Sequence, residues 1–271
     1  MCQLLRYFSS KYKKALYYIK ASQHPMTHNF MITCPRNKFW KNRLWKMIDE
    51  LDIHKWIVGF EEGKDGYRHL QVRVRLSKGK EEGFTAIKEY LPIAHVEECS
   101  DTWEYERKTA RFLSSDDTPE IRQVRFGKMR WYQKVMIENT LNQGDRGITV
   151  WYNPSGKIGK SWLTNHLWET GQAYIVQVTD NVKSMVQDVA SEYMEHGFRK
   201  ILVLDFPREW KWNSDVYTAV ERIKDGLIKD TRYHSRTINI RGVCILIMCN
   251  TAPDTKRLSD DRWDIHEDYY V

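Results

Sequence analysis

The sequence of 271 residues predicts an α/β protein with two domains that differ in sheet type. In the first block, two expected strands are joined by the short segment Gly-Lys-Asp-Gly at 63–66, which is typical of an antiparallel hairpin. From residue 148 onward, apolar strands alternate with helical stretches, a pattern typical of a parallel sheet. Between the blocks lies the polar segment Ser-Ser-Asp-Asp-Thr-Pro at 114–119, which indicates a domain boundary.

The first block predicts an α+β domain, an antiparallel sheet with helices. Its first helix is supported by apolar residues that recur near helical spacing, and its strands are supported by runs of β-branched and aromatic residues. The expected strands are 30–34, 56–61, 69–76 and 95–97, and the expected helices are 38–51, 84–91 and 102–112.

The second block predicts a P-loop α/β domain. Its expected strands are 148–152, 174–178, 201–205 and 243–249. We therefore divide the chain into a basic N-terminal extension (1–25), a first domain (26–115), a linker (116–130) and a second domain (131–271).

Composition excludes several classes of protein. A hydrophobic content of 41% with 11 Trp and 15 Tyr is too high for a disordered polyelectrolyte. No apolar run approaches the roughly 18 to 20 residues that cross a bilayer, so we expect no membrane partner. Five cysteines without a Cys-x-x-Cys pair or a secretory leader favour a reducing compartment over a disulfide framework or a zinc site.

The net charge of +7 is concentrated at the N-terminal end. Residues 1–50 contain ten Lys and Arg against two Asp and Glu. Such a basic region attracts phosphate backbones through counterion release, which indicates a nucleic-acid partner. A solvated, lysine-rich terminal helix without a partner is an equally good interpretation of the first 20 residues.

A mixed set of metal donors is predicted in the first domain. His69 and Gln71 project from one face of their strand because side chains alternate along a strand. The neighbouring strand ends in Glu61-Glu62, and either carboxylate could complete the set. One imidazole, one carboxamide and one carboxylate suit Mg²⁺ or Mn²⁺ better than zinc.

Tyr105 and Lys108 are candidates for covalent chemistry. They lie three residues apart on an expected helix, so their side chains should share a face. A tyrosine oxygen can attack a phosphodiester and retain the phosphate covalently, helped by a nearby ammonium group and by a metal ion. An amphipathic helix that carries this pair by chance is the alternative.

A Walker A loop is predicted between the strand 148–152 and the helix that follows. The string Gly-Lys-Ile-Gly-Lys-Ser covers 156–161, with Pro154 in place of the usual first glycine. Backbone N–H groups in such a loop cradle the phosphates of ATP, Lys160 reaches the β and γ phosphates, and Ser161 binds Mg²⁺. The candidate ATP contacts here are Gly156, Lys157, Gly159, Lys160 and Ser161.

Two further strand ends carry candidate ATP contacts. Asp205 ends an apolar strand, where a Walker B acid holds Mg²⁺ through water. A second acid is missing, because Phe206 follows directly. Asn250 ends the strand 243–249 and could sense the γ phosphate, although a turn cap is the simpler interpretation.

These motifs in this order resemble the replication initiators of small circular single-stranded DNA viruses, including nanoviruses and their satellites, circoviruses and smacoviruses. The resemblance runs from Phe30-Met31-Ile32-Thr33 through His69-Leu70-Gln71 and Tyr105-Glu106-Arg107-Lys108 to the Walker motifs. It implies an HUH endonuclease domain followed by a superfamily 3 helicase domain. Val72-Arg73-Val74-Arg75 after Gln71 departs from the glycine that many members have.

The resemblance also implies roles for individual residues. It makes His69 and Gln71 metal ligands, selects Glu61 over Glu62 as the third ligand, and makes Tyr105 the nicking nucleophile with Lys108 beside it. In the second domain it carries the Walker B and motif C roles to Asp205 and Asn250. Further candidates are Arg262 as an arginine finger and Lys229, Arg232 and Tyr233 as DNA contacts.

The expected function is therefore rolling-circle initiation with Mg²⁺ or Mn²⁺ and ATP. The expected partners are single-stranded DNA, an origin stem-loop, the host replication machinery and further copies of the chain in a hexamer. The expected location is the nucleus of a eukaryotic host, or otherwise the cytoplasm. The alternatives are a plasmid-type initiator and a P-loop ATPase whose first domain binds nucleic acid without nicking it.

Overall fold

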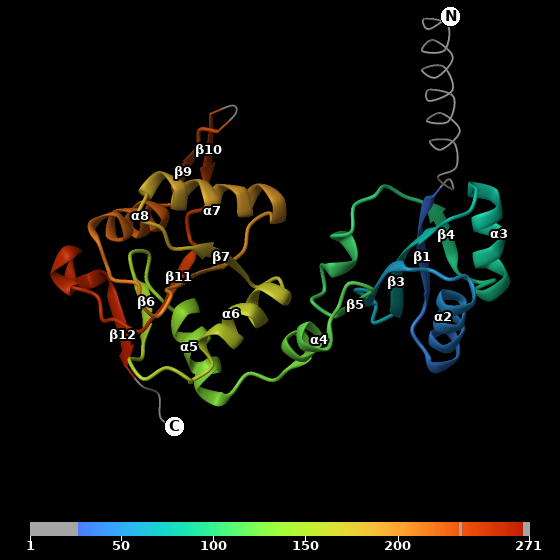
Figure 1. Cartoon of the computed structure of the whole chain (residues 1–271), viewed down its shortest axis with the longest axis horizontal. Coiled ribbons are helices and arrows are strands. Elements are labelled where there is room, and N and C mark those ends of the chain that lie inside the picture. The colour runs from blue at the N-terminus through green and yellow to red at the C-terminus, as the bar shows by residue number, and fades with distance from the viewer. Residues whose placement is uncertain (1–26, 233–234, 268–271) are drawn as a thin grey trace, which may run out of the picture. The chain divides into compact units, whose positions relative to one another are not determined.

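The computed structural model describes residues 27–232 and 235–267 and divides the chain into two compact units, which meet between Asp117 and Thr118. This division falls inside the polar segment 114–119. The basic extension expected at 1–25 lies outside the described residues. Figure 1 shows the order of the elements along the chain. No helix within the described ranges is both long and apolar enough to span a membrane.

The first unit contains a five-stranded antiparallel sheet with the strand order β4-β1-β3-β2-β5. The mixture of this sheet with helices agrees with the α/β class predicted from the sequence. Its elements are β1 (His28–Pro35), α2 (Lys38–Glu50), β2 (Lys55–Glu62), β3 (Arg68–Leu76), α3 (Lys80–Tyr90), β4 (His95–Glu98), η1 (Tyr105–Arg107) and β5 (Phe112–Ser114).

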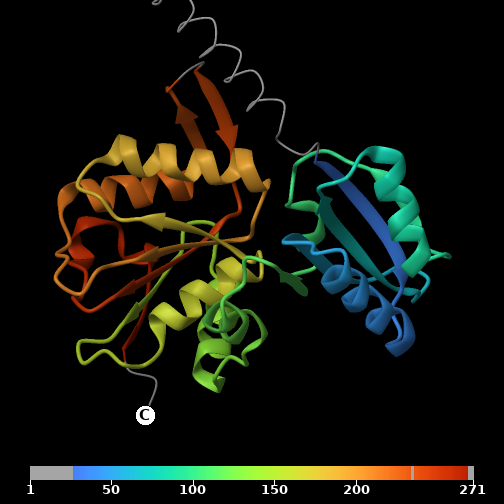
Figure 2. The same cartoon turned by 45° about the vertical axis from the view of Figure 1, so that its right-hand side comes forward.

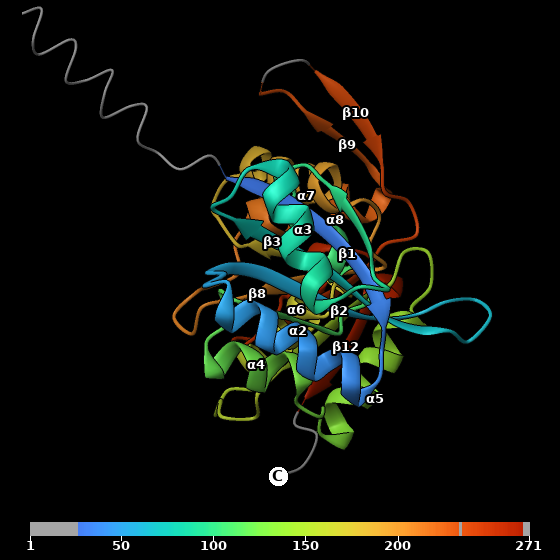
Figure 3. The ribbon, with the colours of Figure 1, turned by 90° about the vertical axis from the view of Figure 1, so that its right-hand side faces the viewer.

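Helices α2 and α3 cover one face of this sheet (Figure 3). Alternate residues of β1 and β3 point toward these helices, including Phe30, Ile32, Leu70 and Val72, and all four are buried. Burying each such side chain stabilises the fold by about 1.5–3 kcal/mol. The other face of the sheet carries the intervening residues, which are polar in β3.

Two expected helices of the first unit differ from those observed. Helix α3 begins at Lys80 rather than near residue 84, and its acidic first turn complements the positive end of the helix dipole. The helix expected at 102–112 is wrong, because the structure has only the single 3₁₀ turn η1 there, followed by β5. Ala110 has a φ of 56°, and β5 pairs with β2 instead of continuing a helix.

The second unit contains a five-stranded parallel sheet with the order β12-β6-β11-β8-β7, and all strands are parallel as expected. Its elements before the hairpin are α4 (Pro119–Phe126), α5 (Trp131–Leu141), β6 (Ile148–Tyr152), α6 (Lys160–Glu169), β7 (Ala173–Gln177), α7 (Val182–His196), β8 (Ile201–Asp205) and α8 (Ser214–Asp225). They are followed by β9 (Leu227–Asp230), β10 (Arg236–Asn239), β11 (Cys244–Cys249), η2 (Thr255–Arg257), η3 (Asp260–Arg262) and β12 (Trp263–Glu267).

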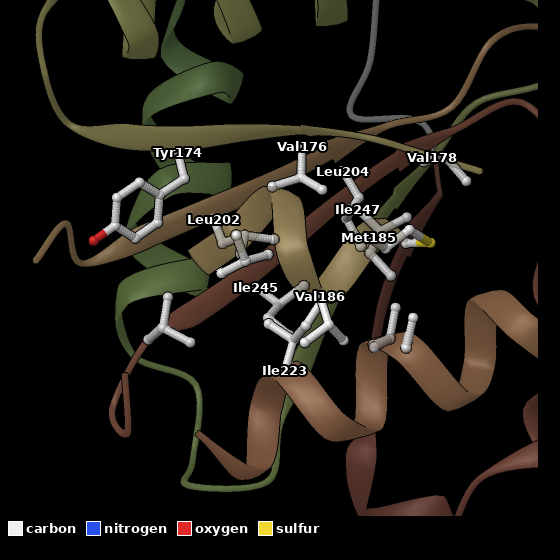
Figure 4. Packing of buried hydrophobic residues seen from close by; sticks show 14 of the residues in the cluster. Tyr174, Val176, Val178, Met185, Val186, Leu202, Leu204, Ile223, Ile245 and Ile247 are labelled. Atoms are coloured by element: carbon white, nitrogen blue, oxygen red, sulfur yellow. The ribbon is translucent and has the colours of Figure 1, made fainter. Parts of the chain in front are cut away.

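Helices cover both faces of the parallel sheet, with α7 and α8 on one face and α5 and α6 on the other (Figure 1). Because both faces are covered, the central strands are apolar throughout, and all six residues of β11 are buried. Figure 4 shows side chains of β7, β8 and β11 packed against Met185 and Val186 of α7 and Ile223 of α8. The antiparallel β9–β10 hairpin extends beyond α7 and α8 (Figure 2).

The stretch 116–130, expected as a linker, contains helix α4. Thr118 caps this helix by accepting a hydrogen bond from the Ile121 N–H at 3.2 Å. Arg125 then pairs with Glu169 of α6 at 2.8 Å, and the carbonyl oxygen of Val124 lies 2.8 Å from His166 Nδ1. These contacts attach α4 to the second unit.

Candidate functional site

The polar face of the antiparallel sheet brings the three expected metal ligands together. Glu61 of β2 and His69 of β3 are directly paired across the two strands, and Gln71 lies two residues further along β3 on the same face. The distance from His69 Nε2 to Glu61 Oε2 is 3.5 Å. Glu61 and Gln71 are buried, so the three donors share a partly dehydrated site.

Thr33 orients the carboxamide of Gln71. Its hydroxyl donates a hydrogen bond to Gln71 Oε1 at 2.9 Å from the adjacent strand β1, where Thr33 and Gln71 are paired. The string Phe30-Met31-Ile32-Thr33 therefore contributes to this site in two ways. Phe30 and Ile32 anchor the strand in the core, and Thr33 reaches the ligand set on the opposite face.

The structure distinguishes the two adjacent glutamates. Glu61 is buried beside His69, whereas Glu62 is exposed and its Oε2 accepts a hydrogen bond from Arg68 at 2.9 Å. Alternation along β2 puts the two carboxylates on opposite faces. Only Glu61 therefore lies with His69 and Gln71.

The donor set fits a hard divalent cation. Glu61 Oε1 is buried and has no hydrogen-bond partner among the residues that the structure describes, and such an atom carries a desolvation cost that a bound cation would offset. Outside the masked segments, no three His, Cys, Asp or Glu side chains cluster as metal ligands. The present site consists of Glu61, His69 and the carboxamide oxygen of Gln71. This combination suits Mg²⁺ or Mn²⁺.

Tyr105 and Lys108 lie beside this donor set. The Lys108 ammonium is 3.8 Å from the centroid of the Tyr105 ring and 2.9 Å from Glu61 Oε2. Burial acts to lower the pKa of Lys108, but the hydrogen bonds and the charge interactions with Tyr105 and Glu61 together raise it. Tyr105 is 50% exposed, so it is accessible from solvent.

The expected helix is absent here, yet the structure still brings Tyr105 and Lys108 together. The Lys108 N–H donates to the Tyr105 carbonyl oxygen at 3.4 Å, which closes one 3₁₀ turn. Residues three apart are eclipsed in a 3₁₀ turn, so the two side chains lie on one side of it. The spacing was therefore informative although the predicted element was wrong.

The second candidate site surrounds the loop between β6 and α6. Gly159 precedes α6 with a φ of 86°, and Gly156 has a φ of 74°, values that favour glycine. Asn153 Oδ1 accepts a hydrogen bond from the Gly156 N–H at 2.5 Å. A cavity of about 390 Å³ lies on this loop and is lined by Gly156, Lys157, Ile158, Gly159, Lys160, Ser161, Trp162, Arg208 and Asn250.

The carboxyl ends of β6, β8 and β11 meet at this loop, as parallel strands require. Lys160 Nζ donates to the carbonyl oxygen of Cys249 at 2.6 Å, and Asn250 Nδ2 donates to that of Asn153 at 2.5 Å. Asp205 Oδ2 accepts a hydrogen bond from Thr164 of α6 at 3.1 Å. Burial raises the pKa of Asp205, although Thr164 and Lys160 act in the opposite direction.

Arg208 is a residue of this site that the sequence analysis missed. Its Nη2 donates to the carbonyl oxygen of Ser155 at 2.8 Å, and it lines the same cavity as Lys160. The available signal was its position three residues after Asp205, because the loop after β8 begins at the carboxyl end of the parallel strands, as does the loop between β6 and α6.

Arg262 lies at the amino end of the parallel strands, whereas the loop between β6 and α6 lies at their carboxyl end. Arg262 precedes β12, whose first residue Trp263 pairs with the first residue of β6. Its guanidinium is buried and contacts Glu221 Oε1 at 3.1 Å and Asp225 Oδ1 at 3.5 Å. An arginine finger must expose its guanidinium to a neighbouring subunit, so this arrangement does not favour that role.

The DNA-contact candidates belong to the β9–β10 hairpin. Lys229 is exposed on β9, where it pairs with Thr237 of β10. Arg232 follows β9, and its guanidinium contacts Asp230 Oδ2 at 3.0 Å and Ser191. Tyr233 lies outside the described residues.

The chain therefore carries a tyrosine beside a cluster of Glu61, His69 and Gln71 in its first unit, and a glycine-containing loop between a strand and a helix in its second unit. Among curated sequences, the chain is 25% identical over 172 residues to the Master replication protein of Milk vetch dwarf virus (isolate N), covering 63% of this chain and 57% of the relative. It is 23% identical over 174 residues to the Master replication protein of Subterranean clover stunt virus (strain F), with the same coverage. No family model matches the chain.

A third relative is Para-Rep C2 of Milk vetch dwarf C2 alphasatellite, 31% identical over 121 residues, covering 44% of this chain and 39% of the relative. The chain thus spans 57% of the length of the master replication proteins it matches. These similarities confirm the resemblance to replication initiators of circular single-stranded DNA viruses.

Proposed function

We propose that this chain initiates rolling-circle replication by nicking and rejoining single-stranded DNA through Tyr105. The observation that carries the proposal is the contact of Lys108 with both the Tyr105 ring and the Glu61 carboxylate, beside His69 and Gln71. A nucleophile, a cation and a divalent-metal donor set within one contact network suit phosphodiester cleavage.

In the proposed reaction, the Tyr105 oxygen loses its proton to solvent and attacks the scissile phosphorus. The bond from phosphorus to the 3′ oxygen breaks, and that oxygen takes a proton and leaves as a free 3′ hydroxyl. The 5′ phosphate stays on Tyr105. In the reverse step, a 3′ hydroxyl attacks the phosphotyrosine, which reforms the DNA strand and releases Tyr105.

Glu61, His69 and Gln71 would hold the Mg²⁺ or Mn²⁺ ion. When bound, the ion supplies charge that polarises the scissile phosphate. Thr33 fixes the orientation of the Gln71 carboxamide, and Lys108 places positive charge beside both Glu61 and the tyrosine. These contacts hold the donors in place before DNA binds, which lowers the reorganisation needed for cleavage.

The second unit is proposed to bind and hydrolyse ATP and so unwind DNA. Lys160, Ser161 and Arg208 line the cavity where phosphates would lie, and Asp205 and Asn250 end the neighbouring strands. Lys157 and the backbone of Gly156 and Gly159 complete that lining. The β9–β10 hairpin with Lys229 is the proposed DNA contact of this unit.

The partners proposed are an origin stem-loop, a host polymerase that extends the free 3′ hydroxyl, and further copies of the chain in a hexameric ring. The nucleus of a eukaryotic host is the proposed location. The relatives described above are viral and satellite proteins, which favours a viral initiator over a plasmid-type one.

The experiment that tests the proposal is covalent capture. The full chain is mixed with Mn²⁺ and a pool of single-stranded oligonucleotides that carry candidate stem-loops, and the products are separated on a denaturing gel. We expect a protein–DNA adduct that disappears in Tyr105→Phe while DNA binding persists. An adduct of equal yield in Tyr105→Phe places the nucleophile elsewhere. Binding without any adduct in the wild-type chain favours the ATPase whose first domain only binds nucleic acid.

A further inference from the structure

Arg73 and Glu106 form a fully buried ion pair on the polar face of the antiparallel sheet. Arg73 lies on β3 two residues beyond Gln71, and Glu106 is the central residue of η1, next to Tyr105. The side chains of Arg73 and Glu106 are 4% and 0% exposed. A buried charge pair of this kind persists only with good geometry and additional hydrogen bonds.

The contacts of Arg73 meet both conditions. Its Nε lies 3.0 and 3.1 Å from the two carboxylate oxygens of Glu106. Its Nη1 donates to the carbonyl oxygen of Ser100 at 2.6 Å and lies 3.1 Å from Cys99 Sγ. The guanidinium of Arg73 therefore holds both residues 99–100, which lead into the segment that contains Tyr105, and the turn η1 itself.

Gly59 on β2 allows this turn to lie directly on the sheet. A Cβ atom at Gly59 would stand 2.6 Å from the carbonyl oxygen of Glu106, closer than such atoms can approach. The backbone of η1 therefore occupies the space that a side chain would fill. Beyond the turn, the Phe60 N–H donates to the Arg111 carbonyl oxygen at 2.8 Å, which fixes the exit of the segment.

The segment has little regular structure of its own. Between the end of β4 at Glu98 and the start of β5 at Phe112, η1 is the only helical element, and it has three residues. A single 3₁₀ turn is not stable without tertiary contacts. The position of Tyr105 therefore depends on what holds its neighbour Glu106.

We propose that the Arg73–Glu106 pair, seated against Gly59, positions Tyr105 for attack on DNA. Arg73 and Glu106 are positioning residues, because they act through the backbone of η1 and do not touch the reacting atoms. The inference rests on the proposed cleavage by Tyr105. A misplacement of about 1 Å in a reacting group can lower a rate roughly a hundredfold. Loss of the Arg73–Glu106 pair should therefore lower kcat with little effect on DNA binding.

The main test is Arg73→Lys in the full chain. Lysine keeps the positive charge beside Glu106 but cannot reproduce the planar fork that holds Glu106 and Ser100 together. We expect kcat for cleavage of a single-stranded oligonucleotide with Mn²⁺ to fall at least about tenfold, with KM within about twofold of wild type. Rates are measured well below the thermal midpoint of each variant, so partial unfolding does not contribute.

Two further variants test the same inference without an unpaired buried charge. Arg73→Met combined with Glu106→Leu removes both charges, a replacement that buried ion pairs often tolerate. Gly59→Ala changes no charge and displaces the Glu106 carbonyl. Both should show the same loss of kcat at nearly constant KM. If Arg73→Lys does not fold, these two variants test whether the Arg73–Glu106 pair positions Tyr105.

The controls use features of the same unit that do not hold η1. Lys46→Met with Glu50→Gln removes an exposed ion pair of 3.5 Å within α2, and Gly79→Ala adds a Cβ where no atom lies within 4 Å. Both should cleave at the wild-type rate. The inference is overturned if the Arg73, Glu106 and Gly59 variants also keep the wild-type kcat. If Tyr105→Phe still forms the adduct, the proposed function itself fails instead.

Discussion

The ammonium group of Lys108 lies over the ring of Tyr105, 3.8 Å from its centroid, and also contacts Glu61 Oε2 at 2.9 Å. One lysine thus connects the proposed nucleophile with the proposed metal-donor set. The turn that brings them together depends on the buried Glu106, which lies between them in the chain.

Lys108→Met should lower the rate of the first cleavage step by roughly ten- to a hundredfold, because the charge near the attacking oxygen and the phosphate is lost. Lys108→Arg should retain more activity than Lys108→Met. Single-turnover cleavage of a labelled oligonucleotide measures the rate. Lys64→Met, in the turn between β2 and β3, is the control and should leave it unchanged. A wild-type rate in Lys108→Met removes Lys108 from the mechanism.

Glu61→Gln should weaken the metal dependence of cleavage, while Glu62→Gln should have no effect. The carboxylate of Glu61 faces His69, and that of Glu62 pairs with Arg68 on the exposed surface. We expect the Mn²⁺ concentration for half-maximal cleavage to rise at least about tenfold for Glu61→Gln, because a hard cation loses its anionic ligand. If Glu62→Gln weakens the metal dependence and Glu61→Gln has no effect, the ligand is Glu62.

Lys160→Ala should abolish ATP hydrolysis and unwinding and leave cleavage of single-stranded DNA unchanged. Lys160 lines the cavity proposed to hold the phosphates of ATP, and it belongs to the unit that does not contain Tyr105. The matched variant Lys157→Ala alters an exposed lysine of the same loop and should lower the ATPase rate much less. Phosphate release and cleavage are measured in parallel. Loss of cleavage in Lys160→Ala would show that the two activities share a site.

A chain that ends at Asp117 should fold and cleave single-stranded DNA without ATP. This end point keeps the ion pair of Lys55 with Asp116 and the hydrogen bond from the Ser114 N–H to Asp117 Oδ2 at 2.9 Å. Every proposed nuclease residue precedes it. Circular dichroism checks folding, and adduct formation checks activity. A folded fragment without activity would show that cleavage needs the second unit.

Two buried cysteines should report the unfolding of each unit separately. Burial raises the pKa of the Cys34 thiol to about 11 and that of Cys249 to about 12. At pH 8 only about one Cys34 thiol in a thousand would be ionised, because each unit of pKa changes this ratio tenfold. Iodoacetamide should therefore label them only as denaturant unfolds their units, which mass spectrometry can follow. Rapid labelling of either cysteine in the native protein contradicts this burial.

The two kinds of sheet, most strand positions and the glycine-containing loop between β6 and α6 could be predicted from the sequence alone. These features depend on local patterns, such as alternation along β1 and β3 and the glycines that precede α6. The sequence also indicated His69, Gln71 and Tyr105 through short strings, which gained weight from their order along the chain.

How the segment around Tyr105 is held became clear only from the tertiary structure, which also places Glu61, the glutamate that the resemblance selected, on the face of His69. The pattern at 102–112 predicts a helix because its apolar and charged residues suit one. In the structure Glu106 instead forms a buried ion pair with Arg73. The choice of Glu61 depends on strand register, since a shift of one residue would place Glu62 on that face. Arg73, Gly59 and Arg208 were not identified because their partners are distant in sequence. The contacts of each residue form only when the sheet of its own unit has formed.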